Sequence, residues 1–430
     1  HLGAMRRFSF SQPGFDADFR AFLDERRGSP HDVDAAAAKV LDAVRTEGLE
    51  AVLRFTRDFD KVELTEDTVR VTEAEIDEGA AACPAEVREA IDFAAARIAA
   101  YHARQRPADA RFVDEAGVEL GWRWTPLESV GVYVPGGRAA YPSTVLMNCV
   151  PAQAAGVDRI AMVTPPGKLQ PAVLAAAKAA GVKEIWRIGG AQAVAALAYG
   201  AGPIAPVDKI VGPGNAYVTA AKRRLYGVVG IDALAGPSEI VVVADNQNDP
   251  AWIAADLLSQ AEHDPAAQSI LITDDAAFAD AVEAAIETEL QALSTAEDAR
   301  ASLRDHGAVI IAPLDVSPGL VDLIAPEHVE FAVEDPDALA DRVRHAGAIF
   351  LGRHTPEAVG DYVAGSNHVL PTSRAARFQS GLSLYDFLKR TSLVRCDVAS
   401  FAKLGPPTRA LAEAEGLPAH ARSAGIRLNR

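Results

Sequence analysis

The stretch Val130-Gly131-Val132-Tyr133-Val134-Pro135-Gly136-Gly137 decides the fold that we expect for this chain. Its apolar first half is typical of a buried strand, and Pro-Gly-Gly is typical of the turn that follows such a strand. Apolar residues over 143–155 then predict a helix. A strand, a glycine turn and a helix in this order form the repeating unit of a parallel α/β sheet.

The same unit recurs along the chain in two series. In the first series, strands are expected over 159–163, 184–188 and 209–211, with helices over 171–180, 191–199 and 215–226. In the second series, strands are expected over 239–244, 269–273, 308–311, 329–332 and 348–351, with helices over 250–263, 275–293, 316–324, 336–343 and 356–363. Such alternation implies parallel sheets with right-handed crossovers. We therefore predict an α/β fold with two doubly wound, Rossmann-like parallel-sheet domains, an N-terminal helical segment and a C-terminal helical tail.

The predicted domain boundaries follow from where each series begins and ends. The βα rhythm stops after Gly381, and the helices expected over 383–390 and 408–414 have no sheet to cover. A tail that cannot bury its own apolar face must dock elsewhere, on this chain or on a partner. The predicted units are a helical arm over 5–26, a discontinuous metal and substrate domain over 27–130 and 239–381, a nucleotide-binding domain over 131–238 and the tail over 382–430.

The composition excludes several classes of protein. A net charge of −17 argues against a nucleic-acid surface and against an anionic membrane. We see no membrane-spanning run and no secretory signal, and the first four residues resemble a cloning remnant before Met5. Cys83, Cys149 and Cys396 are widely spaced, so they form no evident disulfide framework. These features predict a cytoplasmic protein.

Three glycine-rich turns follow strands of the first series. They are Pro135-Gly136-Gly137, Gly189-Gly190-Ala191-Gln192 and Gly212-Pro213-Gly214-Asn215. Glycine lets a backbone approach a phosphate, and the helix after each turn offers free N–H groups. None matches Gly-x-Gly-x-x-Gly, so ordinary turn chemistry is the alternative explanation. Tyr133, Gln192 and Asn215 would add a stacking face and two amides to a dinucleotide site here.

The helix over 250–263 carries a polar pair at its end. Asp249 is its expected N-cap, and Pro265 stops it. Gln260 and His263 are three positions apart, so both side chains lie on one face of the last turn. A helix C-terminus favours a cation, but it also favours a histidine that merely caps the last carbonyl groups.

Further polar groups lie in the second series and the tail. Glu327-His328 could handle two protons if the loop turned them inward, and a solvated loop pair is the alternative. Asp361 is either a ligand or a capping acid, His368 is either functional or structural, and Glu415 and His420 lie on a constrained tail turn. Two imidazoles, a carboxylate and an amide oxygen suit Zn²⁺ better than Ca²⁺ or Mg²⁺. His263, His420, Asp361 and Gln260 would form such a set, although spacing alone does not bring them together.

Taken together, several segments resemble the histidinol dehydrogenase family, in the same order and over nearly the whole chain. They are Val132-Tyr133-Val134-Pro135-Gly136-Gly137, Gly212-Pro213-Gly214-Asn215-Ala216-Tyr217-Val218, Ala235-Gly236-Pro237-Ser238-Glu239, Ser259-Gln260-Ala261-Glu262-His263, Ala325-Pro326-Glu327-His328 and Glu415-Gly416-Leu417-Pro418-Ala419-His420. The resemblance implies a zinc-dependent enzyme of histidine biosynthesis. Such an enzyme takes L-histidinol to L-histidine with two NAD⁺, through bound L-histidinal.

The resemblance also implies a role for each matching residue. It implies that Gln260, His263, Asp361 and His420 bind one zinc ion and that Glu327 and His328 form the catalytic pair. Substrate contacts would come from Ser238, Gln260, His263, His328, Asp361, His368, Glu415 and His420, and NAD contacts from Tyr133, Gln192 and Asn215. In the family the tail crosses to the other subunit, so a homodimer with shared active sites is implied.

Three alternatives remain open at this stage. The first is a paralogous NAD-dependent dehydrogenase of another small polar alcohol, which would lack the substrate contacts implied for His368 and Glu415. The second is a metal-dependent hydrolase that handles aldehydes, which would need no dinucleotide loops. The third is a non-catalytic nucleotide-binding subunit, which would not need Glu327 and His328.

Overall fold

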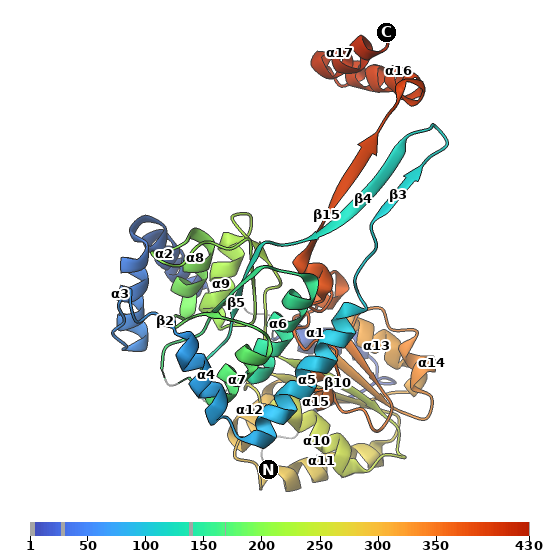
Figure 1. The fold of residues 1–430 in the computed structure, drawn as a ribbon. Coiled ribbons are helices and arrows are strands. Elements are labelled where there is room, and N and C mark those ends of the chain that lie inside the picture. Colours follow the sequence, from blue (N-terminus) through green and yellow to red (C-terminus); the bar gives the residue numbers. More distant parts are fainter. Residues whose placement is uncertain (1–4, 27–30, 137–140, 168, 430) are drawn as a thin grey trace.

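The computed structural model describes residues 5–26, 31–136, 141–167 and 169–429 of the chain. These residues form two six-stranded sheets flanked by helices, and a three-stranded sheet that extends from them as an arm (Figure 1). The expected α/β fold with two parallel-rich sheets is confirmed. None of the described helices has both the length and the apolar character needed to cross a membrane.

Sheet A is entirely parallel and is built around one apolar strand. Its strands, in spatial order, are β1 (Arg6–Ser9), β12 (Ala308–Ile311), β11 (Gln268–Thr273), β10 (Glu239–Ala244), β13 (His328–Ala332) and β14 (Ala348–Leu351). In β10, Ile240 and Val242 pack on one face, and Val241 and Val243 pack on the other. Burial on both faces explains why this strand is apolar throughout.

Helices cover both faces of sheet A. One face packs against α10 (Pro250–Ala261), α11 (Ala276–Leu290) and α12 (Ala296–His306). The other face packs against α1 (Phe15–Asp24), α13 (Ser317–Ile324) and α14 (Pro336–Ala340). The short helix α15 (Glu357–Tyr362) follows β14, and the 3-10 turns η1 (Leu314–Val316) and η2 (Ala375–Arg377) complete this region.

Sheet B is parallel except for one short edge strand. Its strands, in spatial order, are β2 (Arg70–Val71), β7 (Glu184–Trp186), β6 (Arg159–Val163), β5 (Ser129–Tyr133), β8 (Lys209–Val211) and β9 (Gly230–Ile231), with β2 antiparallel to β7. One face packs against α4 (Glu73–Ala82), α5 (Ala85–Ala103), α6 (Pro142–Ala155) and α7 (Pro171–Ala179). The other packs against α2 (His31–Glu47), α3 (Leu49–Asp60), α8 (Gly190–Tyr199) and α9 (Ala216–Leu225).

Two features of the N-terminal region differ from the expected domain assignment. Residues 27–130 are predicted to belong with sheet A, but Ala37, Leu41 and Val44 of α2 are buried in the core between α2 and sheet B. An apolar stripe predicts a helix without revealing which sheet the helix covers. Residues 5–26 are predicted to be helical, but Arg6–Ser9 pair with β12 as an edge strand before α1 begins.

The C-terminal tail leaves the body of the molecule along a narrow arm (Figure 1). The arm comprises β3 (Ala110–Val113), β4 (Glu119–Pro126), β15 (Leu388–Arg395), α16 (Val398–Ala414) and α17 (Pro418–Arg427). The helix predicted over 383–390 is wrong, because only the 3-10 turn η3 (Leu384–Phe387) precedes β15, which pairs antiparallel with β4. The pairing of β15 with β4 places the start of the tail in the three-stranded sheet, which was not predicted from the sequence.

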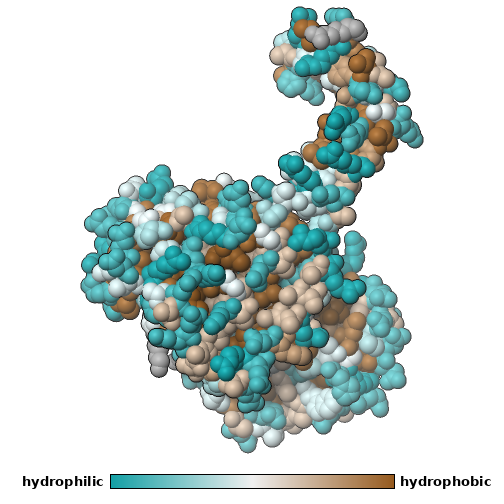
Figure 2. Space-filling model, in the orientation of Figure 1, coloured by the Kyte–Doolittle hydropathy of each residue, from teal (hydrophilic) through white to brown (hydrophobic). Residues whose placement is uncertain are grey.

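The arm exposes apolar side chains that one chain does not cover. Val398 is 85% exposed and Leu411 is 67% exposed. Figure 2 shows brown, apolar residues on the arm among hydrophilic ones, well separated from the body. Such exposed apolar surface usually marks an interaction site.

Candidate active site

A pocket of about 200 Å³ lies where the two sheets meet. Sheet B contributes segments that follow its strands, including Thr144 after β5 and Pro213 after β8. Sheet A contributes the opposite ends of its strands, because Ser238 precedes β10 and Glu327 precedes β13. Of the residues predicted for the site, Ser238, Gln260, His263, Glu327, His328, Asp361 and His368 all line this one pocket.

Helix α10 directs its C-terminal end into the pocket. Asp249 accepts a hydrogen bond from the Ala251 N–H at 2.9 Å, as expected for its N-cap. At the other end, the buried Oε1 of Gln260 has no hydrogen-bond partner among the described residues. An orphaned buried amide oxygen next to His263, at an electronegative helix end, fits a cation ligand.

Asp361 completes this side of the pocket from helix α15. Its Oδ1 lies 4.0 Å from Nε2 of His328, and its backbone carbonyl is 3.1 Å from Nδ1 of His368. Ligand atoms of His328, Glu357 and Asp361 lie within 4.8 Å of one another. This group shares only Asp361 with the predicted ligand set, and its Glu357 does not line the pocket. The predicted donors that do line the pocket are the amide oxygen of Gln260, His263 and Asp361, which are ligand types that fit Zn²⁺.

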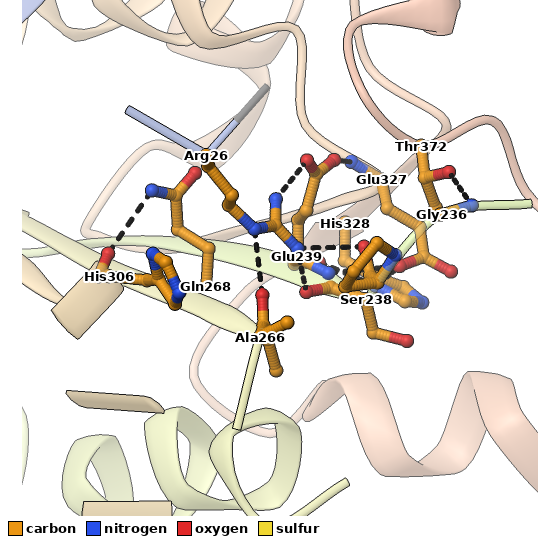
Figure 3. A network of polar contacts seen from close by, with 12 residues as sticks. Arg26, Gly236, Ser238, Glu239, Ala266, Gln268, His306, Glu327, His328 and Thr372 are labelled. Carbon is orange, nitrogen blue, oxygen red and sulfur yellow. Dashed lines mark hydrogen bonds and ion pairs between the residues drawn. The ribbon is translucent and has the colours of Figure 1, made fainter. Parts of the chain in front are cut away.

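The geometry fixes which nitrogen of His328 carries the proton. Its Nδ1 lies 2.9 Å from the backbone carbonyl oxygen of Glu239, as Figure 3 shows. A carbonyl oxygen only accepts, so Nδ1 carries the proton, and Nε2 of the neutral ring keeps an acceptor lone pair that faces Oε1 of Glu357 at 3.1 Å. Burial lowers the pKa of His328 to about 4, which keeps the ring neutral near pH 7. Nε2 can therefore act as a proton acceptor.

Burial has the opposite effect on the neighbouring carboxyl group. Glu327 is buried, and its Oε2 accepts a hydrogen bond of 3.0 Å from the Glu239 N–H. The burial, together with the nearby Glu239 carboxyl group, raises the pKa of Glu327 well above its usual value. Adjacent groups whose pKa values are pushed apart are typical of acid–base catalysis.

Two buried acids near the pocket, Glu357 and Glu330, were not predicted from the sequence. Oε1 of Glu357 lies 3.1 Å from Nε2 of His328. Burial, and then Asp361, raise the pKa of Glu357 to about 10. Glu330 accepts a 2.6 Å hydrogen bond from the Glu357 N–H. A glutamate within the apolar strand 329–332 was a visible signal, because buried strands rarely carry an acid without a partner.

The residues predicted to bind NAD lie outside this pocket, near the carboxyl ends of the strands of sheet B. The hydroxyl of Tyr133 accepts a 2.8 Å hydrogen bond from the Gly190 N–H, and Gln192 is buried in α8. Asn215 is exposed and caps α9, because its Oδ1 accepts from the Val218 N–H at 3.0 Å. Gly137 of the first turn lies outside the described residues. Two glycine turns thus present neighbouring helix N-termini, which fits an anionic cofactor.

Part of the glycine pattern has an explanation within the chain itself. Gly212 has φ +111°, and a Cβ there would lie 2.2 Å from the backbone oxygen of Tyr133. A Cβ on Gly189 would lie 2.6 Å from the ring of Pro165. These turns need glycine for internal packing, so the glycines alone do not identify a ligand.

Two predicted residues are not brought to the pocket within one chain. Glu415 ends α16 and His420 lies in α17, both on the arm that extends from the body (Figure 1). Neither lines the pocket. A single chain therefore supplies three of the four predicted zinc ligands, Gln260, His263 and Asp361, to one place.

Comparison with known proteins gives one consistent result. A sequence model of the family described as histidinol dehydrogenase matches residues 23–428. The histidinol dehydrogenase of Caulobacter vibrioides is 81% identical over 424 residues, 99% of each chain. That of Rhodospirillum rubrum is 58% identical over 428 residues, again 99% of each chain. The crystal structure of histidinol dehydrogenase from Elizabethkingia anophelis matches with a TM-score of 0.94 at 35% identity, covering 100% of this chain and 99% of that chain.

Proposed function

This chain belongs to the histidinol dehydrogenase family and is an oxidoreductase, and we propose that it oxidises L-histidinol to L-histidine in two NAD-linked steps. The reaction would serve histidine biosynthesis. The observation that carries the proposal is the single pocket lined by the Glu327–His328 pair together with Gln260, His263 and Asp361. Ser238 and His368 line the same pocket and would contact the substrate.

The proposed metal is one zinc ion per site. Gln260, His263 and Asp361 of one copy would hold it together with His420 of a second copy. The orphaned Oε1 of Gln260 and the electronegative end of α10 support this assignment. When bound, zinc would supply a charge that anchors the imidazole and amino nitrogens of histidinol.

The proposed cofactor site lies at the carboxyl ends of the strands of sheet B. Tyr133, Gln192 and Asn215 would contact NAD, which accepts a hydride in each of the two steps. Support comes from the helix N-termini after the glycine turns, since backbone N–H groups there can bind a pyrophosphate in a chain whose net charge is −17. Oxidation of one alcohol to a carboxylate requires two NAD⁺.

In this proposal His328 and Glu327 divide the proton chemistry. Nε2 of His328 would take the hydroxyl proton as the alcohol becomes an aldehyde, and the aldehyde would stay bound. Glu327 would polarise a water that adds to the carbonyl carbon, and His328 would take a proton from the hydrate during the second oxidation. A cation in the pocket would favour the ionised form of Glu327, because an opposite charge nearby lowers a carboxyl pKa.

The proposed assembly is a homodimer whose arms complete each other's sites. Support comes from Val398 and Leu411, which the arm exposes in a single chain. The position of Glu415 and His420 on the same arm also supports a homodimer. Both residues are expected in an active site, and neither lines the pocket of its own chain. We further propose a cytoplasmic location, which suits the free thiols of Cys83, Cys149 and Cys396.

The deciding experiment measures NADH formed from L-histidinol by the purified chain with NAD⁺ and zinc. We expect two NADH for each histidinol and a loss of the activity with a chelator. Formation of one NADH with release of the aldehyde would contradict the two-step proposal. A larger kcat/KM for another small polar alcohol would instead identify the chain as a dehydrogenase of that alcohol.

A further inference from the structure

Glu239 contacts both members of the Glu327–His328 pair. Strands β10 and β13 are neighbours, and their register sets Ile240 opposite His328. The Glu239 N–H donates to Oε2 of Glu327 at 3.0 Å, and the Glu327 N–H donates to Oε1 of Glu239 at 3.2 Å. With the bond from His328 Nδ1 to the Glu239 carbonyl, one residue makes three hydrogen bonds to the pair.

A distant arginine holds Glu239 from the other side. Arg26 follows α1, and its Nη1 donates to Oε2 of Glu239 at 2.6 Å. The guanidinium also donates to the carbonyl oxygens of Ala266 at 2.7 Å, Pro237 at 2.8 Å and Ser238 at 3.1 Å. Figure 3 shows Arg26 beside Glu239, Ser238 and Ala266. The Arg26 side chain is only 9% exposed, so the charge sits inside the protein.

We propose that Arg26 and Glu239 form a positioning pair that fixes the direction of Glu327 and His328 in the pocket. The inference rests on the proposed function, since it assigns the pair a task in that reaction. Neither residue lines the pocket, so both would act through the residues that do. No role for Arg26 follows from the sequence motifs.

The electrostatics explain why a cation is needed at this position. Glu239 and Glu327 are both buried, and two adjacent buried carboxyl groups disfavour each other's ionised form. The guanidinium compensates Glu239 and leaves its second oxygen free to accept from the Glu327 backbone. Removing one member of a buried pair leaves an uncompensated group that must rotate or take up a proton. The Glu239 carboxyl group would then no longer hold the backbone N–H of Glu327, which is one of the three bonds that direct the pair.

The chain offers a matched control at the opposite end of the same two strands. Arg353 donates to both oxygens of Asp245, which follows β10, at 2.6 and 2.8 Å. It also donates to the carbonyl oxygen of Ala332, which ends β13, at 3.1 Å. Arg353→Gln therefore breaks a comparable arginine–carboxylate pair on β10 and β13 without touching the pocket.

The test compares Arg26→Gln, Arg26→Lys and Arg353→Gln as zinc-loaded enzymes. For each, kcat and KM are measured with histidinol and with histidinal, and the melting temperature is recorded. We expect Arg26→Gln to lower kcat about 10- to 100-fold, as loss of a supporting hydrogen-bond partner does at other sites. The histidinal step should fall further than the histidinol step, because it uses Glu327 as well as His328. Arg26→Lys should recover part of the loss, and Arg353→Gln should keep the original kcat.

A second measurement covers the case in which Arg26→Gln folds poorly. In Arg26→Ala, added guanidinium should restore activity, while sodium chloride at the same ionic strength should not. A merely unstable variant would lose both half-reactions in equal proportion and would not respond to guanidinium. Equal losses in both half-reactions, or a kcat unchanged in Arg26→Gln, would overturn the inference. If the unsubstituted chain forms no NADH from histidinol, the proposed function itself fails and this inference falls with it.

Discussion

At the scale of single residues, burial acts in opposite directions on the two neighbours Glu327 and His328. Burial disfavours the charged form of either group, so it raises the pKa of the carboxyl and lowers that of the imidazole. In the metal-free chain, burial therefore favours the protonated form of Glu327 and the neutral ring of His328. A cation bound in the pocket would favour the ionised form of Glu327. Two different proton tasks can therefore be performed by adjacent residues at the start of β13.

The division of tasks predicts a selective effect of Glu327→Gln. The amide keeps the size of the side chain and an oxygen that can accept from the Glu239 N–H, but it cannot ionise. We expect oxidation of histidinol to stay within about tenfold of the original rate, and oxidation of histidinal to fall about 100-fold or more, as expected for loss of a general base. NADH formation from each substrate measures both steps. The control is Glu334→Gln, whose side chain is 94% exposed, and equal losses in both steps would contradict the split roles.

The orphaned amide oxygen of Gln260 predicts a trade between stability and metal binding. An unsatisfied buried polar group costs about 1–3 kcal/mol, so Gln260→Leu should raise the free energy of unfolding of the metal-free chain by a similar amount. The same variant should bind zinc more weakly, by more than the roughly 10- to 100-fold that loss of an outer partner costs. Urea unfolding and zinc titration measure the two effects.

The control for this prediction is another buried glutamine, Gln268. Its Nε2 donates to the carbonyl oxygen of His306 at 3.1 Å, so its amide is satisfied. Gln268→Leu should therefore lower the free energy of unfolding and leave zinc binding unchanged. If Gln260→Leu also destabilises the metal-free chain, the buried Oε1 of Gln260 does not carry the cost of an unsatisfied group, and the prediction fails.

Residues close in sequence were predicted far better than those joined only by the fold. Gln260 and His263 share a helix turn, and Glu327 and His328 are adjacent, so spacing alone made each pair a candidate. Arg26 and Glu239, which form a hydrogen bond, are 213 residues apart in the sequence. No local pattern reports such a contact. Glu330 carried a signal, an acid within an apolar strand, but its partner Glu357 is 27 residues further along.

At the scale of elements, α5 shows how a buried polar group links a helix to a distant loop. His102 is fully buried near the end of α5, and its Nδ1 lies 2.8 Å from Oε1 of Gln105. Its Nε2 lies 3.3 Å from Nδ2 of Asn367, whose neighbour His368 lines the pocket. Burial lowers the pKa of His102, so the folded chain keeps this imidazole neutral.

This linkage predicts how stability depends on pH. A histidine in an unfolded chain has a pKa near 6.5. Below about pH 6.5, His102 therefore binds a proton in the unfolded chain more readily than in the folded chain, where its pKa is lower. The free energy of unfolding should therefore fall with decreasing pH, by at most about 1.36 kcal/mol per pH unit from this group. His102→Gln should show a shallower fall between pH 7 and pH 5, measured by urea unfolding of the metal-free chain. The surface variant His354→Gln is the control, and an unchanged slope in His102→Gln would exclude the effect.

The helices and strands that were predicted from the sequence are those whose side chains are buried in a core, because burial gives them a regular pattern of apolar residues. The strand expected over 159–163 is β6, and the helix expected over 250–263 is α10, which ends two residues earlier. Among the elements that were not predicted, β1, β2 and β15 are short or exposed strands. Their sequences RRFS, RV and LKRTSLVR have no apolar alternation, since pairing with another strand rather than core burial makes them strands.

At the scale of the whole molecule, the pocket uses opposite ends of the two sheets. Sheet B contributes the carboxyl ends of its strands, where doubly wound sheets usually bind ligands. Sheet A contributes amino ends, because Ser238 and Glu327 each precede a strand. The general rule therefore locates the proposed cofactor loops from the sequence, but it does not locate the proposed substrate side of the pocket. That side forms where the amino ends of β10 and β13 lie against segments that follow the strands of sheet B.

The arm allows a direct test of the proposed homodimer, because His420 lies on the arm and His328 lies in the pocket of the body. If the body of one copy meets the tail of another, His328→Asn and His420→Asn each abolish activity for different reasons. A mixed dimer of the two variants would contain one dead site, with both substitutions, and one intact site. Random pairing makes half of the dimers mixed, so co-expression should restore about one quarter of the original activity.

The controls for this experiment are each variant expressed alone and the two variants mixed after separate purification, when subunit exchange is slow. Both should be inactive. Activity in the co-expressed sample then measures a site built from two chains. If co-expression restores nothing although mixed dimers are isolated, His420 acts on its own chain, and the arm must bend back over the body instead of reaching a partner.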